Sequence, residues 1–557
     1  MAPTPVIPDD ERDRLLNELA AWEKDLKPLR DQWDIFWERW ELLAPDDDDN
    51  PYISRFQAPY PFSHVETIVP RIIGDDPTID YIAIEHEDDD PKAAMLGAVV
   101  NWQLQLMRFE AECRNYARQG CITGYTVGKL GWNRETEIRT VEVIREEYHE
   151  ELMTSFETRA DEDVEWVLQN QAFFETVDIY DFVWPVRAVS LNKAKAVWQR
   201  CWVPLSELKD MEKKGFYRNV DLVKPYEGEA TKRTDLAVRF GAQGLSPSEI
   251  TDDPDAAEVE VWERWENDRL TVIAGREVVL RDDPNPFHHK RKPFTDFCPV
   301  ERPFSMHGVG IIKMLYDMNE DLGALKRQRR DAITFTINPM WKATEGIKQS
   351  DIKLRPGGVW NVPDTEDVEP ATTPNIDFSA SYQEEQNAKN DMQAVTGAFD
   401  YLSGINPGGV QTATGVATIA QEGNKRITEM VKIFTERTMK PLAWQMASLV
   451  IQYLDNSVAI PLYQYPEAAA AWAELKKLDA PRIAQVGRED ITTAGQVLPL
   501  PQVGADKQAN DVQKRSDAVQ VIQALTPMLA APQPVVNVKE LTDYVLKQFG
   551  VDRKSVV

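Results

Sequence analysis

The stretch that decides the fold is PFSMHGVGIIKMLYDMNEDLGALKRQRRDAITFTINPM, residues 303–340. Apolar residues recur in it at spacings of four and three, which places them on one face of an amphipathic helix. We expect this helix to begin near Gly308 and to end at Asn338-Pro339, because proline disfavours helical backbone at the residue before it. The apolar face consists of Ile311, Leu315, Met318, Leu322 and Leu325.

Beyond this helix the chain predicts a small β module, a second helix and a glycine-rich loop. Strand-like runs at 340–344 and 358–362 are separated by turn residues such as Pro356-Gly357. A polar helix is expected over 379–396, and four glycines follow within 397–409. Glycine lowers the barrier to reshaping such a loop. The predicted order is therefore helix, small β module, helix and loop.

This order of elements resembles the portal proteins of tailed double-stranded-DNA bacteriophages. In that family a stem helix descends, a clip projects, a second stem helix returns and a tunnel loop faces the DNA. The segments PFSMHGVG (303–310), Gln328-Arg329 and TATGV (412–416) are similar to the family, as is PYPFSHVETIVPRIIGDDPTIDYIAIEHEDDDPKAAM (59–95). The resemblance implies an α+β fold that is dominated by helices and has wing, stem, clip and crown regions. These regions are the wing (1–304), the first stem helix (305–334), the clip (335–378), the second stem helix (379–398), the tunnel loop (399–414), a long kinked wing helix with return strands (415–504) and the crown helices (505–557).

Local patterns predict the remaining elements. A three-four rhythm of apolar residues indicates helices over 9–43 and 91–123, and the tryptophans of the first suggest docking onto the same subunit or a neighbour. In the long helix after the tunnel loop, Pro441 removes a backbone donor, so we expect a kink near Arg437–Lys440. Further expectations are helices at 62–74, 205–215 and 467–478, an alternation of strand-like and acidic residues at 135–180, strands at 79–85, 173–181, 196–204 and 277–281, and a hairpin at 259–273.

Composition and charge narrow the classes of function. The 557 residues carry a formal net charge of −29, which argues against a protein that grips nucleic acid, because tight binding needs clustered Lys and Arg. No apolar run reaches the roughly 18 residues that a membrane span needs, and the acidic N-terminus does not resemble a signal peptide. Cysteines without a CxxC pair favour a reduced compartment and buried free thiols. They are Cys113, Cys121, Cys201 and Cys298.

No segment specifies catalysis, a cofactor or a metal. The six histidines lack the spacing of a zinc site. The run GYTVGKLGW at 124–132 differs from a phosphate loop in its glycine spacing and in Leu130, so we predict a tight turn and a twisted strand there. The Asp46-x-Asp48-x-Asn50 spacing lacks the glycine and glutamate of a calcium loop. The basic run His288–Lys292 is either a solvated loop or a contact with an acidic neighbour.

The resemblance implies a ring, expected to be a dodecamer, at one vertex of the capsid. Such a ring is the channel for DNA packaging and ejection, and it docks the terminase motor and the head–tail adaptor or tail. The resemblance further implies contacts with major capsid and scaffolding proteins, passage of double-stranded DNA without sequence-specific binding, no catalytic activity and no membrane contact. The protein would be made in the host cytoplasm and reside in the virion. Two other classes stay open: another ring protein such as a head–tail adaptor, and an acidic enzyme with an unrecognised site.

Three groups of residues are candidates for this function. Residues of the tunnel loop are expected to line the narrowest part of the channel, and acidic residues of the clip to contact motor and adaptor. In the stem we expect the early acidic group to meet the late basic group of the next subunit, with an offset of about nine residues, or ~13 Å. The alternative for the basic group is contact with DNA. The tunnel-loop group is Phe399, Asp400, Tyr401, Leu402, Gly404, Gly408 and Gly409; the clip group is Asp364, Glu366, Asp367 and Glu369; the stem group is Asp317, Glu320, Asp321, Lys326, Arg327, Arg329 and Arg330.

Overall fold

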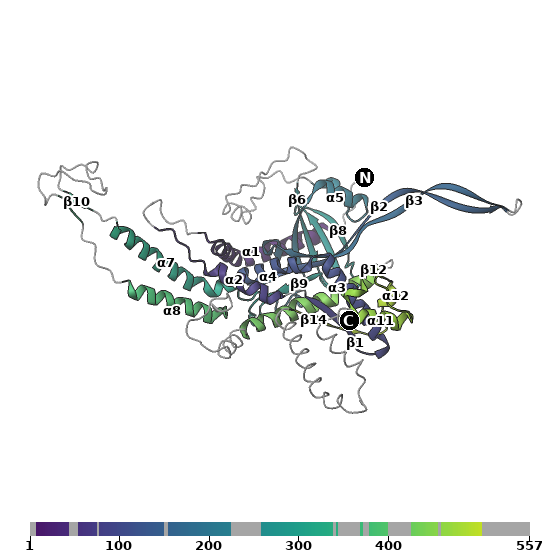
Figure 1. Cartoon of the computed structure of the whole chain (residues 1–557). Helices are drawn as coiled ribbons and strands as arrows, with labels where there is room; N and C mark the ends of the chain where they lie inside the picture. Colours follow the sequence, from purple (N-terminus) through teal and green to yellow (C-terminus); the bar gives the residue numbers. More distant parts are fainter. Residues whose placement is uncertain are drawn as a thin grey trace, which may run out of the picture.

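The chain forms a central body with two projections that leave it in opposite directions (Figure 1). One projection is a pair of helices and the other is a long β-hairpin. Helices and sheets are mixed, so the expected α+β class is confirmed. Among the residues that the structure describes, no helix is both long and apolar enough to cross a membrane. The computed structural model describes residues 7–43, 54–74, 77–149, 154–223, 258–337, 341–343, 368–370, 378–398, 425–454 and 458–503.

The N-terminal part of the body is helical, with one break that the sequence pattern did not predict. The single helix expected over 91–123 is wrong, because Arg108 adopts the left-handed conformation, with φ 51°, and divides it. Phe109 follows the break and is buried, its ring centroid 5.1 Å from that of Phe174. The four helices are α1 (Asp9–Trp40), α2 (Tyr60–Ile73), α3 (Asp90–Leu106) and α4 (Phe109–Thr123).

A five-stranded antiparallel sheet follows, in the order β4-β5-β6-β7-β8. The hairpin expected at 259–273 is confirmed as β6 and β7. A short helix, α5 (Leu205–Lys213), leads out of β5. The strands are β4 (Phe182–Val183), β5 (Val197–Pro204), β6 (Glu258–Trp265), β7 (Arg269–Ala274) and β8 (Val278–Pro284).

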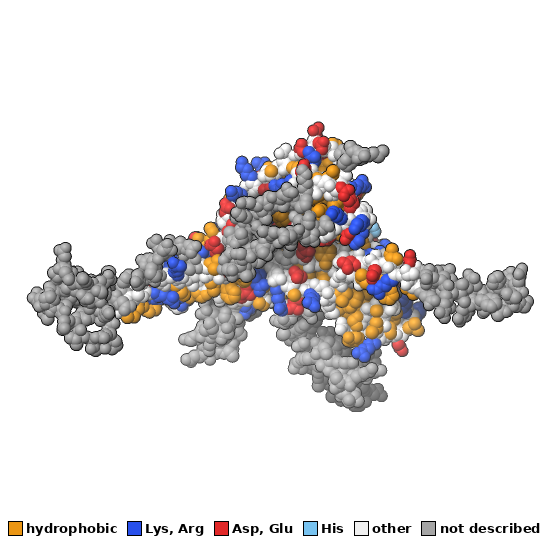
Figure 2. Space-filling model, turned by 90° about the horizontal axis from the view of Figure 1, so that it is seen from above, with side chains coloured by type: hydrophobic (Ala, Val, Ile, Leu, Met, Phe, Trp, Pro, Cys, Tyr) orange, Lys and Arg blue, Asp and Glu red, His pale blue; other side chains and the backbone are white. Residues whose placement is uncertain are grey.

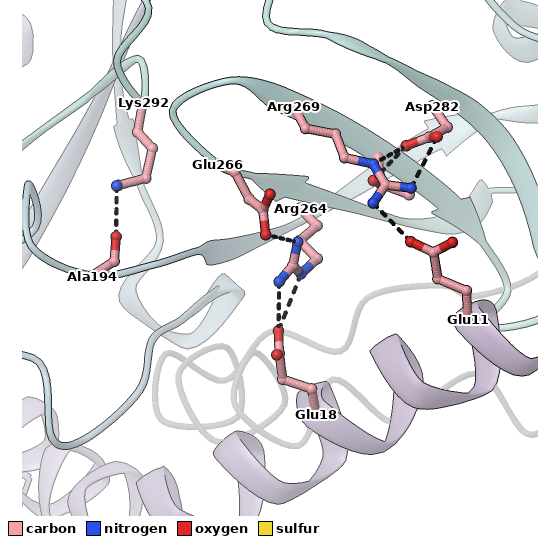
Figure 3. A network of polar contacts seen from close by, with 9 residues as sticks. Glu11, Glu18, Ala194, Arg264, Glu266, Arg269, Asp282 and Lys292 are labelled. Carbon is pink, nitrogen blue, oxygen red and sulfur yellow. Dashed lines mark hydrogen bonds and ion pairs between the residues drawn. The ribbon is translucent and has the colours of Figure 1, made fainter. Parts of the chain in front are cut away.

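Helix α1 packs against its own chain. Of the two alternatives for its tryptophans, the same subunit or a neighbour, the structure shows the first. Trp33 is buried and stacks on Trp184, with ring centroids 6.3 Å apart. Glutamates of α1 reach arginines of the sheet: Glu18 pairs with Arg264 at 3.1 Å, and Glu11 pairs with Arg269 at 2.8 Å (Figure 3). Because Arg264 is almost fully buried, removal of its carboxylate partners would leave a costly unpaired charge. Aromatic packing and ion pairs therefore hold α1 against the body.

The alternating region expected at 135–180 is one continuous hairpin. Its strands are β2 (Thr126–His149) and β3 (Thr154–Val177), and β9 (Phe294–Phe297) pairs with the inner end of β2. Gly124 has φ 86° and makes the predicted turn. Gly128 lies within β2, where a Cβ would stand 2.3 Å from the ring of Phe174, so this glycine makes room for an aromatic side chain.

The C-terminal part of the described chain returns to the N-terminal part. Strand β14 pairs with β1, and β12 with β13. A π-helical turn interrupts the long helix at Thr435–Met439, where the sequence predicts a kink. The crown expected at 505–557 lies outside the described residues. The remaining elements are β1 (Thr78–Ala83), the helical stretch 425–434, α10 (Lys440–Tyr453), β12 (Val458–Ile460), α11 (Pro466–Lys476), β13 (Ala484–Val486), α12 (Arg488–Ile491), β14 (Val497–Gln502) and short 3-10 turns at Glu87–Asp89, Ile179–Asp181, Val220–Leu222 and Leu462–Gln464.

Candidate functional site: the projecting helix pair

The projecting helices α7 and α8 carry the stem group of candidate residues. Helix α7 spans Ile311–Ile337 and α8 spans Ser379–Thr396, and the two lie side by side (Figure 1). The second helix agrees with the prediction, whereas the first begins at Ile311 and not near Gly308. Within the predicted apolar face of α7, Leu315 and Leu322 are fully buried. The periodicity of the sequence therefore identified the face that packs on the rest of the chain.

Close backbone contacts fix the start of α7. The N–H of Gly308 donates to the carbonyl of Gly124 at the end of α4, with a distance of 3.1 Å. A Cβ on Gly310 would lie 2.8 Å from the Gly124 nitrogen, so a side chain does not fit there. Val309, between the two glycines, pairs with Val300 as an isolated β-bridge. This bridge keeps 308–310 out of the helix and explains why α7 begins later than expected.

The π-helical turn holds the segment that precedes α7. Arg437 forms an ion pair with Asp296 and donates to the carbonyl of Met306 at 3.2 Å. Thr438 Oγ1 donates to the carbonyl of Asp296 at 3.0 Å. Burial alone would lower the pKa of Arg437, but the adjacent Asp296 carboxylate raises it above its ordinary value, so the guanidinium stays charged. The base of the helix pair is thereby tied to the C-terminal helix.

One carboxylate, Glu385 of α8, gathers three cations between the two helices. Lys326 Nζ lies 3.0 Å from Glu385 Oε1, and Arg329 Nη2 lies 2.6 Å from Oε2. Lys389, one turn further along α8, is 2.8 Å from Oε1. The guanidinium of Arg329 also lies 4.1 Å from the ring centroid of Tyr382. Two of the four basic residues of the stem group therefore pair within their own chain.

The cluster shifts the pKa of its own members. Burial raises the pKa of Glu385, but hydrogen bonds from Lys389, Arg329 and Lys326 outweigh this effect and lower it to about 2. Burial lowers the pKa of Lys389, and its bond to Glu385 more than reverses that, so its pKa lies above the ordinary value. Both shifts favour the charged form, so Glu385 and Lys389 are ionised at neutral pH.

The segment 54–60 lies against the other side of the same basic run. The ring of Phe56 has the guanidinium of Arg330 4.3 Å from its centroid and the ammonium of Lys326 at 5.2 Å. Arg327 donates to the carbonyl of Phe56 at 3.1 Å, and the N–H of Ser54 donates to Asp331 at 2.8 Å. The basic run is therefore packed between α8 and this segment, although Figure 2 shows that basic side chains still reach the surface of the projection.

The acidic group of the stem divides into paired and exposed members. Glu320 pairs with Arg39 of α1, with an Nε–Oε1 distance of 2.6 Å. Asp317 and Asp321 are exposed, as is Arg330 in the basic group. Contact between stems of neighbouring copies stays a prediction, and these three exposed residues are the ones free to make it without breaking the pairs described above.

The carboxyl end of α8 is anchored where the predicted tunnel loop begins. His64 Nδ1 lies 2.8 Å from Thr396 Oγ1, and both residues are buried. Gly397 ends the helix with φ 77°, and its N–H donates to the carbonyl of Gln393 at 2.8 Å. Arg426 donates to the carbonyls of Ala394 and Val395. The chain therefore leaves at 398 and returns at 425 to the same place. The loop candidates Phe399, Asp400, Tyr401, Leu402, Gly404, Gly408 and Gly409 lie outside the described residues.

The far end of the helix pair leads to a two-stranded module, β10 (Trp341–Ala343) and β11 (Val368–Pro370). The strands are antiparallel, and Glu369 stands opposite Lys342 in their register. The other clip candidates, Asp364, Glu366 and Asp367, lie outside the described residues, as does the strand expected at 358–362. The strand predicted at 340–344 is confirmed over Trp341–Ala343, and it pairs with Val368–Pro370, where no strand was predicted.

The analysis of the sequence missed Glu385, Arg39 and Phe56, which complete the charge contacts of the stem. The sequence does contain a signal for Glu385. It stands four residues before Lys389 on a predicted helix, and the other predicted helix carries the basic run 326–330, which needs counter-charges. Arg39 and Phe56 are more than two hundred residues away from their partners in α7, and no local pattern marks them.

The described residues offer no site with the features of catalysis. They contain no group of three or more His, Cys, Asp or Glu arranged to hold a metal ion. Burial raises the pKa of the thiols of Cys121 and Cys298 to about 12, so neither is a ready nucleophile. The cysteines are free, as expected, and Cys201 is the one that is partly exposed. What the described residues do show is a helix pair, α7 and α8, that projects from the body and is held together by the ion pairs of Glu385.

A helix pair that projects from an α+β body and leads at its far end to a small β module is the arrangement that the resemblance to portal proteins implies. The family model described as phage SU10 portal protein matches residues 65–464, which is most of the chain. The chain belongs to this phage portal protein family, which is a structural family and not an enzyme family. A search of the curated proteins found no match to this chain.

Proposed function

We propose that this protein is the subunit of a ring at a single capsid vertex, with twelve copies, through which DNA enters during packaging by the terminase and leaves at ejection. The observation that carries the proposal is the projection of α7 and α8 from the body, with β10 and β11 at its far end. In this arrangement α7 and α8 are the stem that surrounds the channel. The β10–β11 end is the clip, where terminase and then the adaptor or tail dock.

The charge distribution supports a channel through which DNA slides. Fixed cations that face DNA would exchange for its counterions and hold it in place. In the stem, Lys326 and Arg329 are engaged by Glu385 of the same chain, which reduces the positive charge available to DNA. The sequence 397–424, which contains the proposed tunnel loop, has no Lys or Arg at all. DNA would therefore meet a surface with little attraction for its phosphates.

The anchoring of α8 supports the role of the tunnel loop. Arg426 and the end of α8 hold the two ends of the segment 399–424 together, so a change in the loop need not disturb the stem. Phe399, Tyr401 and Leu402 would provide an apolar constriction, and glycines at 404, 408 and 409 would let it reshape as DNA passes.

Contacts between neighbouring stems would use the exposed charges. Asp317 and Asp321 of one copy would face Arg330 of the next, which stands nine residues after Asp321, or about 13 Å along the helix. Asp321→Arg or Arg330→Glu alone should weaken ring assembly, and the double change should restore part of it. Absence of coupling beyond the sum of the single changes would remove this contact from the account.

Particle images of the purified protein test the proposal most simply. Closed rings with a central hole are expected, with β10 and β11 at one rim. Compact monomers at micromolar concentration would contradict the proposal. A ring whose stem helices lie on the outer surface would instead favour a different kind of ring protein.

A further inference from the structure

The second projection, the outer part of the β2–β3 hairpin, has no function in the account so far. Beyond Asn133 and Asn170 the two strands continue as a ribbon away from the body (Figure 1). The segment 134–149 extends roughly 50 Å at about 3.3 Å per residue. A two-stranded ribbon of this kind is marginal by itself in water, so contact with another surface would stabilise it. We call residues 134–149 and 154–169 the arm.

The arm exposes apolar side chains where it leaves the body. Trp166 is 51% exposed, Leu168 is 54% exposed and Ile138 is 73% exposed. In the antiparallel register Trp166 stands opposite Glu137, and Arg139 on the same face lies with its guanidinium 5.4 Å from the ring centroid of Trp166. Trp166 lies on one face of the ribbon and Ile138 on the other, so both faces expose apolar groups that another molecule could cover.

The arm is also strongly acidic. Its sequence contains ten Asp and Glu against four Arg, and no Lys. Among the residues with described side chains, Glu135, Glu137 and Asp163 are exposed. This charge repels DNA and anionic surfaces, so the partner of the arm should combine apolar groups with unpaired cations.

Another part of this same chain has those properties. The turn 185–196 contains Arg187, Lys193 and Lys195 and no acidic residue, and all three cations are exposed. Val186 and Val189, also exposed, alternate with them. Within the described part of the chain, none of these cations has a carboxylate within 4 Å, although the protein carries a net charge of −29.

A cleft beside this turn exposes a large apolar side chain, Phe304. Val189, Arg302 and Phe304 line the cleft, which has a volume of about 430 Å³. Its carboxylates Asp296 and Glu301 pair with Arg437 of the same lining, and Glu436 pairs with Lys440. Phe304 is 87% exposed and adopts φ 63°, which is uncommon for an aromatic residue. A large apolar side chain held in a strained conformation and turned to solvent suggests that something covers it. We call the turn 185–196 together with Arg302 and Phe304 the acceptor surface.

We infer that the arm of one copy lies on the acceptor surface of the neighbouring copy. The inference rests on the proposed ring, in which head-to-tail contacts of this type close on themselves. The acidic residues of the arm face Arg187, Lys193, Lys195 and Arg302, and its apolar residues cover Phe304 and the exposed valines. Each subunit thereby holds the next near the base of the helix pair, and this contact adds to the one between neighbouring stems.

Cysteine cross-linking tests this contact directly. One variant carries Trp166→Cys on the arm, and a second carries Val189→Cys on the acceptor surface; both positions are exposed, so folding should be kept. Co-assembled with a bismaleimide, these two variants should give cross-linked dimers, whereas one chain with both changes should give a ladder up to the closed ring. Leu168→Cys provides a second arm position, and the wild type measures the background from Cys201.

A charge-reversal series shows whether the complementary charges drive the contact. Lys193→Glu with Lys195→Glu should reduce cross-linking more than about tenfold, because like charges would then face each other. Glu135→Lys with Asp163→Lys in the same chain should restore it. The matched control is Lys213→Glu with Lys214→Glu on and just after α5, which changes charge equally and should leave cross-linking unchanged.

The outcomes separate this inference from the proposed function. Rings that assemble without cross-links between arm and acceptor surface would overturn the inference and leave the ring intact. Cross-links confined to single chains, or cross-links from the arm to a capsid protein only, would also overturn it. Absence of rings under every condition would instead contradict the proposed function.

Discussion

Replacement of Glu385 by Gln should loosen the stem at its centre. The substitution keeps the shape of the side chain but removes the negative charge that three cations share. Lys326, Arg329 and Lys389 would then repel one another in a partly buried place. We expect α7 and α8 to open more often, while the body of the protein stays folded.

The size of the effect follows from the pKa of this carboxyl. The cluster lowers the pKa of Glu385 from 4.5 to about 2, which corresponds to roughly 3 kcal/mol at 1.36 kcal/mol per pH unit. Because the side chain of Lys389 is 30% exposed, screening by solvent reduces this to about 2 kcal/mol. The folded-state pKa is lowered, so the stabilisation is complete above about pH 4.5 and is lost as the pH falls toward 2.

Hydrogen exchange measured by mass spectrometry reports how often α7 and α8 open, peptide by peptide. At neutral pH, peptides from α7 and α8 should exchange about thirtyfold faster in Glu385→Gln, the factor that corresponds to 2 kcal/mol. The matched control is Glu384→Gln, which removes an exposed carboxylate from the adjacent position of the same helix. If the two variants exchange alike, the cluster does not stabilise the stem and the reasoning is refuted.

Three further predictions concern the junction and the clip. Gly310→Ala should destabilise the protein by more than about 2 kcal/mol in thermal unfolding, because the new Cβ would meet backbone at 2.8 Å, whereas Gly97→Ala, with its nearest neighbour at 3.6 Å, should be tolerated. Burial lowers the pKa of His307 to about 4, so its contribution to stability is present above pH 6.5 and declines as the pH falls to 4; His307→Gln should flatten the stability profile in that window and nowhere else. Deletion of Thr365–Val368 should leave rings intact and impair packaging or tail joining, and a normal yield of filled, tailed particles would disprove the assigned role of the clip.

Sequence periodicity predicted the elements whose packing follows a regular face. The apolar residues of α7, such as Leu315 and Leu322, recur at helical spacing because they all meet the same neighbouring surface. The sequence also predicted the hairpin of β6 and β7, because two strand-like runs are separated by turn residues at 266–268. These features are local, so one sequence contains them completely.

The arm and the break in the N-terminal helices were not predicted, for physical reasons that differ. The sequence indicated strand-like and acidic residues at 135–180 but not that they form one hairpin that leaves the body; residues 134–141 and 166–168 are exposed on both faces, so no buried face marks how the strands pair. Arg108 divides α3 from α4 without a proline or glycine to mark the break. Phe109, directly after the break, is buried against Phe174, and this contact between distant segments has no local signal in the sequence.

The sequence also did not predict which residues form ion pairs with the charged groups of α7. Lys326 and Arg329 find Glu385 more than fifty residues later, and Glu320 finds Arg39 in the first helix. The composition of the basic run therefore indicated that counter-charges were needed but not which residues supply them. The structure adds these partners, and they change the expected contact between neighbouring copies from the whole run to its exposed members.

The central claim is that α7 and α8 surround a DNA channel. A cryo-electron microscopy reconstruction of rings of the purified full-length protein tests this most directly. The account predicts a closed ring in which the stem helices of all copies surround the axis, with 397–424 facing the lumen and β10–β11 at one end. A ring whose axis is lined by the five-stranded sheet or by the arm, with α7 and α8 at the periphery, would contradict it.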